Sequence, residues 1–165
     1  RRINAAFDAS SPPPLRALVD ALDAAEEPDG ADALAAVSAA ARFQQQRMAA
    51  HGQASLGDDA TRALVAFLTR AGEPKVLARL FRDPYVYGLS PSTERVAEAL
   101  EGIVSSGGEA ESVLATYHRT KALPGARPDA RTFAAVATAL RGAGFDGLVD
   151  GLREEFEANG VGVAE

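Results

Sequence analysis

The chain contains no cysteine and no tryptophan among its 165 residues, and it has only one methionine and two histidines. Without cysteine, neither a disulfide nor a thiolate zinc site can form. No apolar run approaches the roughly 18 residues that a membrane-spanning helix needs, so we expect no membrane span. Aromatic residues are 6% of the chain, and packing must therefore depend on leucine, valine and alanine, the last of which is the best helix former.

Charge is distributed unevenly around a net value of −6. Residues 42–82 hold seven basic and three acidic side chains, whereas residues 91–165 hold seven basic and twelve acidic ones. This acidic balance argues against phosphate binding along the whole surface, but the basic middle can meet an acidic partner. We predict that its cations contact RNA phosphates or an acidic protein, with an ordinary solvated helix surface as the alternative. These cations are Arg42, Arg47, Arg62, Arg70, Lys75, Arg79 and Arg82.

An apolar quartet with the spacing i, i+3, i+4, i+7 recurs four times. This spacing places its members on one stripe of a helix. The quartets begin at Leu15, Thr61, Val96 and Phe133, which are 46, 35 and 37 residues apart. A recurrence near 35 residues is typical of stacked helical hairpins, in which each unit covers the apolar face of its neighbour. We therefore predict an all-α fold, a short α-solenoid of about four antiparallel helical hairpins.

Turn-forming residues divide the chain at the same intervals. Gly72, Gly107 and Gly144 each lie four positions beyond a quartet, and glycine is preferred just past a helix C-terminus. Pro91 and Pro128 lie five positions before a quartet, and proline is tolerated in the first turn of a helix. The predicted division is an irregular segment 1–13, an atypical first hairpin 14–55, three repeats 56–90, 91–127 and 128–160, and a tail 161–165.

Two local features of the predicted repeats can be checked against a structure. The second hairpin begins near Asp58 or Asp59, and either aspartate is a good candidate for the N-cap. Tyr85 and Tyr87 fall in a connecting loop, where they either bind a partner or wedge between adjacent units.

The sequence begins with Arg1 rather than methionine, and we expect it to start inside a longer precursor.

Residues 129–161 combine a Thr-Phe start, an Ala-Gly turn, a leucine-rich second helix and an Asn-Gly-Val end. This segment resembles a pentatricopeptide repeat (PPR). Residues 91–129 resemble the repeat well, residues 56–90 resemble it less closely, and residues 14–50 match only as a helical hairpin. The resemblance implies a right-handed α-solenoid that resides in a mitochondrion or a plastid and is linked to organellar RNA.

In that family, a polar residue early in the first helix and the last residue of the repeat together read one base. The positions that match are Arg62, Ala97 and Ala134 for the early residue, and Ser92 and Asp129 for the repeat end. An alanine side chain cannot hydrogen-bond a base edge. The residues therefore predict contact with the RNA backbone rather than sequence-specific readout.

Catalytic and metal-binding constellations are sparse. The two histidines, His51 and His118, lie 67 positions apart, and a metal site needs further convergent ligands. The acidic pair Asp58-Asp59 is expected at a helix start and not in a cleft that would shift its pKa values. We expect no catalysis, no metal, no cofactor and no small-molecule substrate.

Together these observations predict a non-catalytic PPR-like scaffold in an organellar ribonucleoprotein. The expected assembly is a mitochondrial ribosome, in which the protein contacts the rRNA backbone and neighbouring protein subunits. One alternative is a free organellar RNA-processing or stability factor. Another is a purely protein-binding solenoid subunit of a large organellar complex. The mitochondrial matrix is the expected location, and the chloroplast stroma is the alternative.

Overall fold

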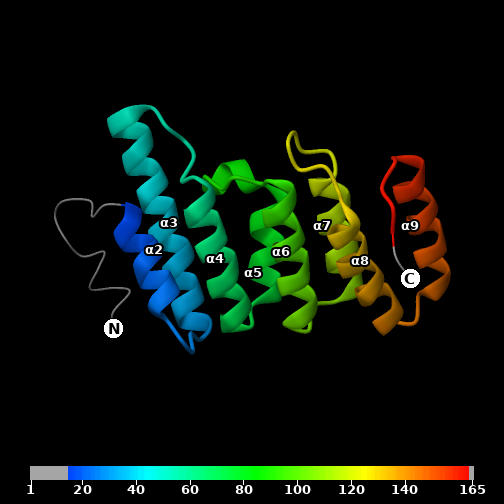
Figure 1. Cartoon of the computed structure of the whole chain (residues 1–165). Coiled ribbons are helices and arrows are strands. Elements are labelled where there is room, and N and C mark those ends of the chain that lie inside the picture. The colour runs from blue at the N-terminus through cyan, green and yellow to red at the C-terminus, as the bar shows by residue number, and fades with distance from the viewer. Residues whose placement is uncertain (1–14, 164–165) are drawn as a thin grey trace.

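The structure is a computed structural model that describes residues 15–163. Within that range the chain forms eight α-helices and one short 3-10 helix, with no strand (Figure 1). The prediction of an all-α protein is therefore confirmed. The predicted N-terminal segment 1–13 and residues 164–165 of the predicted tail lie outside the described residues.

The helices end close to the turn residues predicted from the sequence. Each turn glycine predicted to follow a quartet, at positions 72, 107 and 144, has a positive φ between 68° and 82°, a conformation that glycine adopts without strain. In chain order the elements are α2 (Leu15–Ala24), α3 (Gly30–His51), α4 (Asp58–Ala71), α5 (Pro74–Arg82), η1 (Pro84–Tyr87), α6 (Thr93–Ser105), α7 (Ala110–Thr120), α8 (Ala130–Gly142) and α9 (Asp146–Ala158).

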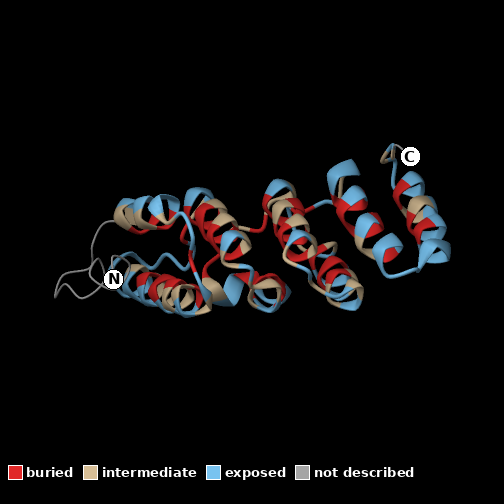
Figure 2. Cartoon of the chain, turned by 90° about the horizontal axis from the view of Figure 1, so that it is seen from below, coloured by how far each residue is buried: buried red, intermediate tan, exposed pale blue. Residues whose placement is uncertain are grey.

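The helices stand side by side in a row that runs from the N-terminal to the C-terminal end of the molecule (Figure 1). One layer is made by α2, α4, α6 and α8, each packed against the next. The other helices lie behind it, so the row is two helices deep (Figure 2). Buried residues lie between the layers and between successive helices, and the apolar core runs along the whole row.

The recurring quartets form the stripe by which the helices of the first layer pack. Every member of the second, third and fourth quartets is buried, and Leu15 in the first is half-buried. Thr61 is the polar member of the second quartet, and its hydroxyl both donates and accepts a hydrogen bond. Its Oγ1 donates to the carbonyl of Gly57 at 2.9 Å and accepts from the amide of Ser90 at 2.9 Å. Thr61 thus ties the start of α4 to the chain that enters α6.

The predicted N-cap at Asp58 or Asp59 is wrong. Gly57 occupies the N-cap of α4 with a φ of 87°, and no side chain caps this helix. Asp58 instead lies in the first turn, where its carboxylate pairs with Arg95 at 2.9 Å. An aspartate at the N-cap would use its carboxylate to accept a backbone amide of its own helix. Because Gly57 takes that position, the carboxylate of Asp58 is left to pair with Arg95 and so joins α4 to α6.

The segment after α5 is more ordered than the predicted loop. Residues Pro84–Tyr87 form η1, and Gly88 ends it with a φ of 73°. Tyr87 is half-buried and Tyr85 is exposed. The carbonyl of Tyr85 accepts from Gln44 Nε2 at 3.4 Å, so η1 contacts α3.

The second layer is more open at two places. α5 packs closely against α7, but the backbones of α3 and α5 stay apart, and α7 contacts α9 through side chains, with the rings of Tyr117 and Phe156 stacked 5.7 Å apart. α3 is also much longer than α5, with 22 residues against nine. A groove therefore opens between α3 and α5, and a smaller hollow opens between α7 and α9.

Candidate functional site

The structure distributes the seven predicted cations over several parts of the surface. Two lie on α4 facing α2, two lie along α3, and three lie on the exposed face of α5. The seven therefore do not form one patch. In the order of these places they are Arg62 and Arg70, then Arg42 and Arg47, then Lys75, Arg79 and Arg82.

Arg62 and Arg70 hold α4 against the C-terminal end of α2. Arg62 Nη2 pairs with Asp23 Oδ2 at 3.2 Å, and this hydrogen-bonded pairing raises the pKa of the Arg62 guanidinium above its ordinary value. Arg70 donates through Nη2 to the carbonyl of Leu22 at 2.7 Å and through Nε to that of Ala25 at 3.1 Å. Both guanidinium groups are engaged within the chain.

We expect Arg70→Ala to lower the free energy of unfolding by about 1–2 kcal/mol, because it removes two hydrogen bonds to carbonyls in the last turn of α2 and just after it. The control is Arg82→Ala, which removes an exposed side chain and should change stability by less than about 0.5 kcal/mol. Urea unfolding followed by circular dichroism measures both. Equal values for the two variants would contradict this role for Arg70.

Arg47 and Arg42 differ from each other in their surroundings. Arg47 donates to Gln53 Oε1 at 2.6 Å and to the carbonyl of Ser55 at 3.3 Å, and it thereby holds the loop after α3. Arg42 is exposed on α3. Of the predicted cations on α3 and α4, Arg42 alone makes no hydrogen bond or ion pair within residues 15–163.

The structure places the five possible repeat-code positions in different surroundings. Ser92 and Asp129 are the N-caps of α6 and α8, and their side chains accept backbone amides at 3.2 and 3.0 Å. Ala97 is fully buried in α6, Ala134 is exposed on α8, and Arg62 is paired with α2. The polar positions are occupied by helix capping, and the buried alanine is out of reach of a ligand.

Ion pairs between neighbouring helices neutralise much of the first layer. Arg95 is only 6% exposed, and its guanidinium contacts Asp58 of α4 at 2.9 Å and also Glu98. Burial alone would lower the pKa of Arg95, but the hydrogen bonds that its guanidinium donates to the two carboxylates outweigh burial and raise the pKa. Arg131 of α8 pairs with Glu101 of α6 at 2.7 Å. Arg95 and Arg131 therefore hold neighbouring helices of the first layer together through ion pairs.

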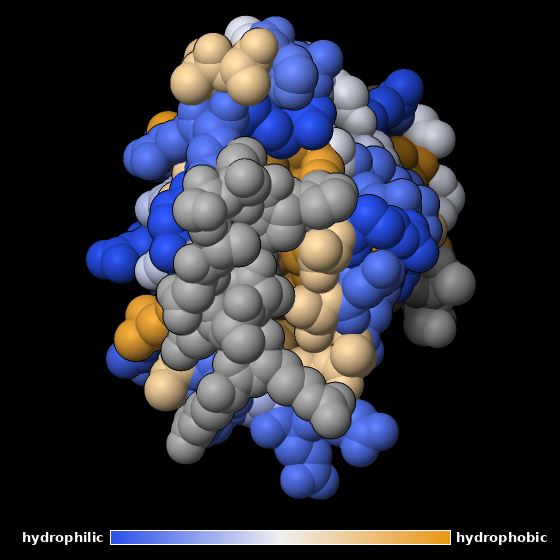
Figure 3. Space-filling model, turned by 90° about the vertical axis from the view of Figure 1, so that its left-hand side faces the viewer, coloured by the Kyte–Doolittle hydropathy of each residue, from blue (hydrophilic) through white to orange (hydrophobic). Residues whose placement is uncertain are grey.

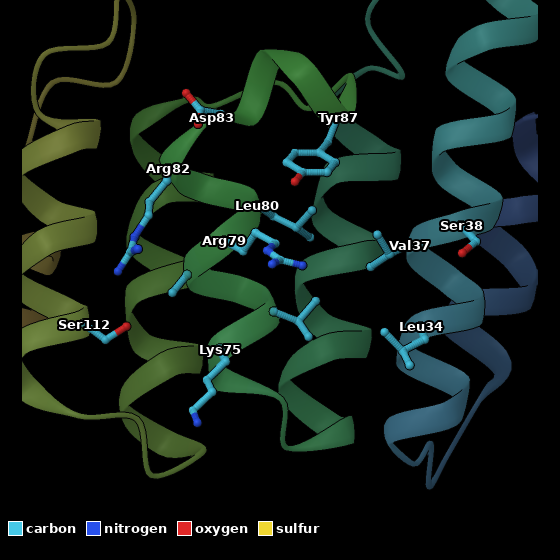
Figure 4. A pocket seen from close by; sticks show the side chains of 12 residues that line it. Leu34, Val37, Ser38, Lys75, Arg79, Leu80, Arg82, Asp83, Tyr87 and Ser112 are labelled. Carbon is cyan, nitrogen blue, oxygen red and sulfur yellow. The ribbon is translucent and has the colours of Figure 1, made fainter.

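The groove between α3 and α5 gathers the remaining cations, and we call it the α3–α5 groove. Its volume is about 720 Å³. Figure 4 shows Leu34 and Val37 projecting from α3 toward α5, with Arg79 on the facing wall and Tyr87 above. Its lining is Leu34, Val37, Ser38, Lys75, Val76, Ala78, Arg79, Leu80, Arg82, Asp83, Tyr87 and Ser112.

The α5 wall of this groove is basic. Lys75, Arg79 and Arg82 are exposed at the spacing i, i+4, i+7, which places them along one face of α5. None has a carboxylate within ion-pair distance among the described residues. The one acidic lining residue, Asp83, pairs with Arg119 at 3.0 Å. The wall therefore offers three cations to a ligand.

The α3 wall is apolar. Leu34 is 65% exposed, and Val37 is half-buried beside it. Viewed from the N-terminal end of the molecule, some moderately hydrophobic surface lies between hydrophilic areas (Figure 3). This end-on view does not look into the α3–α5 groove. The α3 wall was not predicted from the sequence, because the alanines of α3 dilute its periodic pattern. Leu34 and Val37, three positions apart, were the available signal.

The hollow between α7 and α9 has a volume of about 370 Å³, and its polar groups are bound to one another. Lys121 Nζ lies 2.7 Å from Glu155 Oε1 and holds the pKa of that carboxyl below its usual range. Burial raises the pKa of the Tyr117 hydroxyl beside them. A phenol with a raised pKa and a carboxylate in an ion pair are poor general bases at neutral pH.

The described residues contain no group of three or more histidine or acidic side chains that could hold a metal ion. In the same range, no helix has both the length and the hydropathy required to cross a lipid bilayer. Comparison of the chain with protein-family models, with curated protein sequences and with solved structures finds no match.

Proposed function

We propose that this protein is a non-catalytic helical-repeat scaffold, a short right-handed α-solenoid of about four antiparallel hairpins related to pentatricopeptide repeats. The neighbour-to-neighbour packing of the buried quartets supports this architecture, because each unit covers the apolar stripe of the next. The cross-helix ion pairs also join successive units. An elongated row of this kind provides surface for holding partners.

The proposed role is to contact the backbone of organellar RNA and neighbouring protein subunits in a ribonucleoprotein, with a mitochondrial ribosome as the expected assembly. The observation that carries the RNA contact is the row of cations on α5, Lys75, Arg79 and Arg82, which have no carboxylate partner within residues 15–163. Lysine and arginine at this spacing can neutralise successive phosphates without reading bases. Base-specific readout is not proposed, since the repeat-code positions Ser92 and Asp129 cap helices.

The expected compartment is the mitochondrial matrix, with the chloroplast stroma as the alternative. A purely protein-binding solenoid is the second candidate function. It is favoured by the exposed Leu34 and by Val37 on the wall facing the cations. Apolar side chains do not stabilise contact with a charged phosphate backbone, whereas they do stabilise contact with an apolar protein surface. The two functions predict different results in the same binding assay.

The test is binding of a single-stranded RNA over a range of salt concentrations. We expect log K to fall linearly with log salt. Replacement of Lys75, Arg79 and Arg82 by alanine should reduce the slope by about 0.7 for each phosphate that is no longer neutralised. The control triple variant replaces Arg16, Arg127 and Arg141 by alanine, an equal change in charge at exposed positions outside the groove. It should keep the wild-type slope.

Two outcomes would contradict the RNA contact. One is the absence of RNA binding at low salt, which would leave the protein-binding solenoid. The other is an equal decrease of the slope in both triple variants, which would show a diffuse charge effect. Co-sedimentation of the native protein with ribosomal particles tests the assembly itself, and failure to sediment with any ribonucleoprotein would count against it.

A further inference from the structure

The α3–α5 groove has an apolar wall that phosphate binding does not explain. Leu34 is 65% exposed although it lines a groove. Val37 lies three positions further along the same helix and lines the groove beside it. Both side chains project from α3 toward the opposite wall (Figure 4). Covering such side chains with another apolar group is favourable, so this wall fits a partner that has an apolar face.

The opposite wall requires the same partner to carry negative charge. Arg79 lines this groove, and it points into the groove in Figure 4. Lys75 and Arg82 line both this groove and the neighbouring hollow between α5 and α7, where Glu109 and Glu111 also lie. Arg79 has no ion-pair partner among the described residues, because Asp83, which lines the same groove, pairs with Arg119. A guanidinium in this position can accept a bidentate carboxylate from a ligand.

The dimensions suit a helix. α5 has nine residues, which at about 1.5 Å per residue span roughly 13 Å. The groove is therefore long enough to hold about two and a half turns of a helical ligand. An amphipathic helix binds a groove by laying its apolar face against apolar side chains, and the cations of the opposite wall complement acidic residues beside that face.

We propose that the α3–α5 groove binds an acidic amphipathic helix of a partner protein. Apolar residues of this helix at i, i+3 or i+4, and i+7 lie against Leu34 and Val37. Its glutamate or aspartate side chains face Arg79 and the two flanking cations of α5. The inference rests on the proposed scaffold function and names the kind of protein segment that the scaffold holds.

The test uses three synthetic peptides of equal length with the full chain. The first is an acidic amphipathic helix of about five turns, with leucine on one face and glutamate beside it. The second carries lysine in place of every glutamate, and the third has the acidic composition in scrambled order. Fluorescence anisotropy should show binding of the first peptide, with the other two binding at least about tenfold more weakly.

Variants of the groove decide where the peptide binds. Leu34→Gln and Arg79→Gln should each weaken binding of the acidic peptide by roughly tenfold. The matched controls are Leu148→Gln and Arg141→Gln, which change an exposed leucine and an exposed arginine outside the groove. Both controls should bind like the wild type. All four side chains are exposed, so each variant should fold, and thermal unfolding by circular dichroism verifies this.

Several results would overturn the proposal. The acidic peptide could fail to bind even at about 1 mM, a concentration that detects weak complexes, or Leu34→Gln and Leu148→Gln could bind it equally. Self-association of the chain that is abolished in Leu34→Gln would assign the groove to a second copy. RNA binding that is abolished in Leu34→Gln, without peptide binding, would assign it to RNA.

Failure of this inference and failure of the RNA contact can be distinguished. RNA binding through phosphates depends on the three cations of α5 and should be unchanged in Leu34→Gln. A protein that binds RNA in this way but never binds the acidic peptide keeps the proposed function and loses the inference. A protein that binds the peptide but no RNA at low salt keeps the inference and loses the RNA contact.

Discussion

Leu100→Ala should lower the free energy of unfolding by about 3–4 kcal/mol. Leu100 belongs to the third quartet and has no exposed surface. It lies in α6, which contacts α4, α5, α7 and α8 and so occupies the centre of the row. Truncation removes buried methyl groups and leaves a cavity that helices held from several sides cannot collapse to fill. The melting temperature should fall by about 2–4 °C for each kcal/mol of stability removed.

The control for this prediction is Leu148→Ala, the same change at a leucine that is 53% exposed on α9. It should lower stability by less than about 1 kcal/mol. Urea unfolding followed by circular dichroism compares the two variants. If they destabilise the protein equally, Leu100 does not pack between the helices as the quartet pattern requires, and the periodic interpretation of the fold is wrong.

Much of the helical fold could be predicted from local patterns. The quartet starting at Val96 is buried throughout, because residues at i, i+3, i+4 and i+7 share a face whatever the tertiary partner is. The turn at Gly72 was equally predictable, since few other residues adopt its φ of 68° without strain. Both signals depend only on backbone geometry. This is why the expected and observed helices agree.

The candidate site was less predictable, because the groove depends on the distance between α3 and α5, which are not adjacent in the sequence. The cations were visible in the sequence, but nothing local shows that Arg62 pairs with Asp23 while Arg79 has no carboxylate partner among the described residues. Such pairing is decided by residues that lie 39 positions apart. The separation of α3 from α5, which exposes Leu34, likewise follows from the length and placement of α3. Tertiary arrangement, rather than periodicity, therefore creates the groove.

Glycine-to-alanine substitutions in two helices should change stability in opposite directions. Gly102 lies inside α6, and a Cβ there would be 2.3 Å from Thr69 Oγ1 and 3.1 Å from Leu77 Cδ1. The Thr69 hydroxyl cannot move away freely, because it donates to the carbonyl of Val65 at 2.8 Å. Gly102 therefore allows α6 to approach α4 and α5 closely. Gly151 lies inside α9, where an added Cβ would meet no atom within 4 Å.

We expect Gly102→Ala to lower the free energy of unfolding by about 1–3 kcal/mol, because the added methyl forces neighbouring side chains apart. Gly151→Ala should raise it by about 0.5–1 kcal/mol, because alanine loses less backbone entropy than glycine in an exposed helix. Denaturant unfolding of both variants gives the two signs directly. Stabilisation by both substitutions would mean that α6 and α4 do not approach at Gly102, and the close packing of successive units would then have to be abandoned.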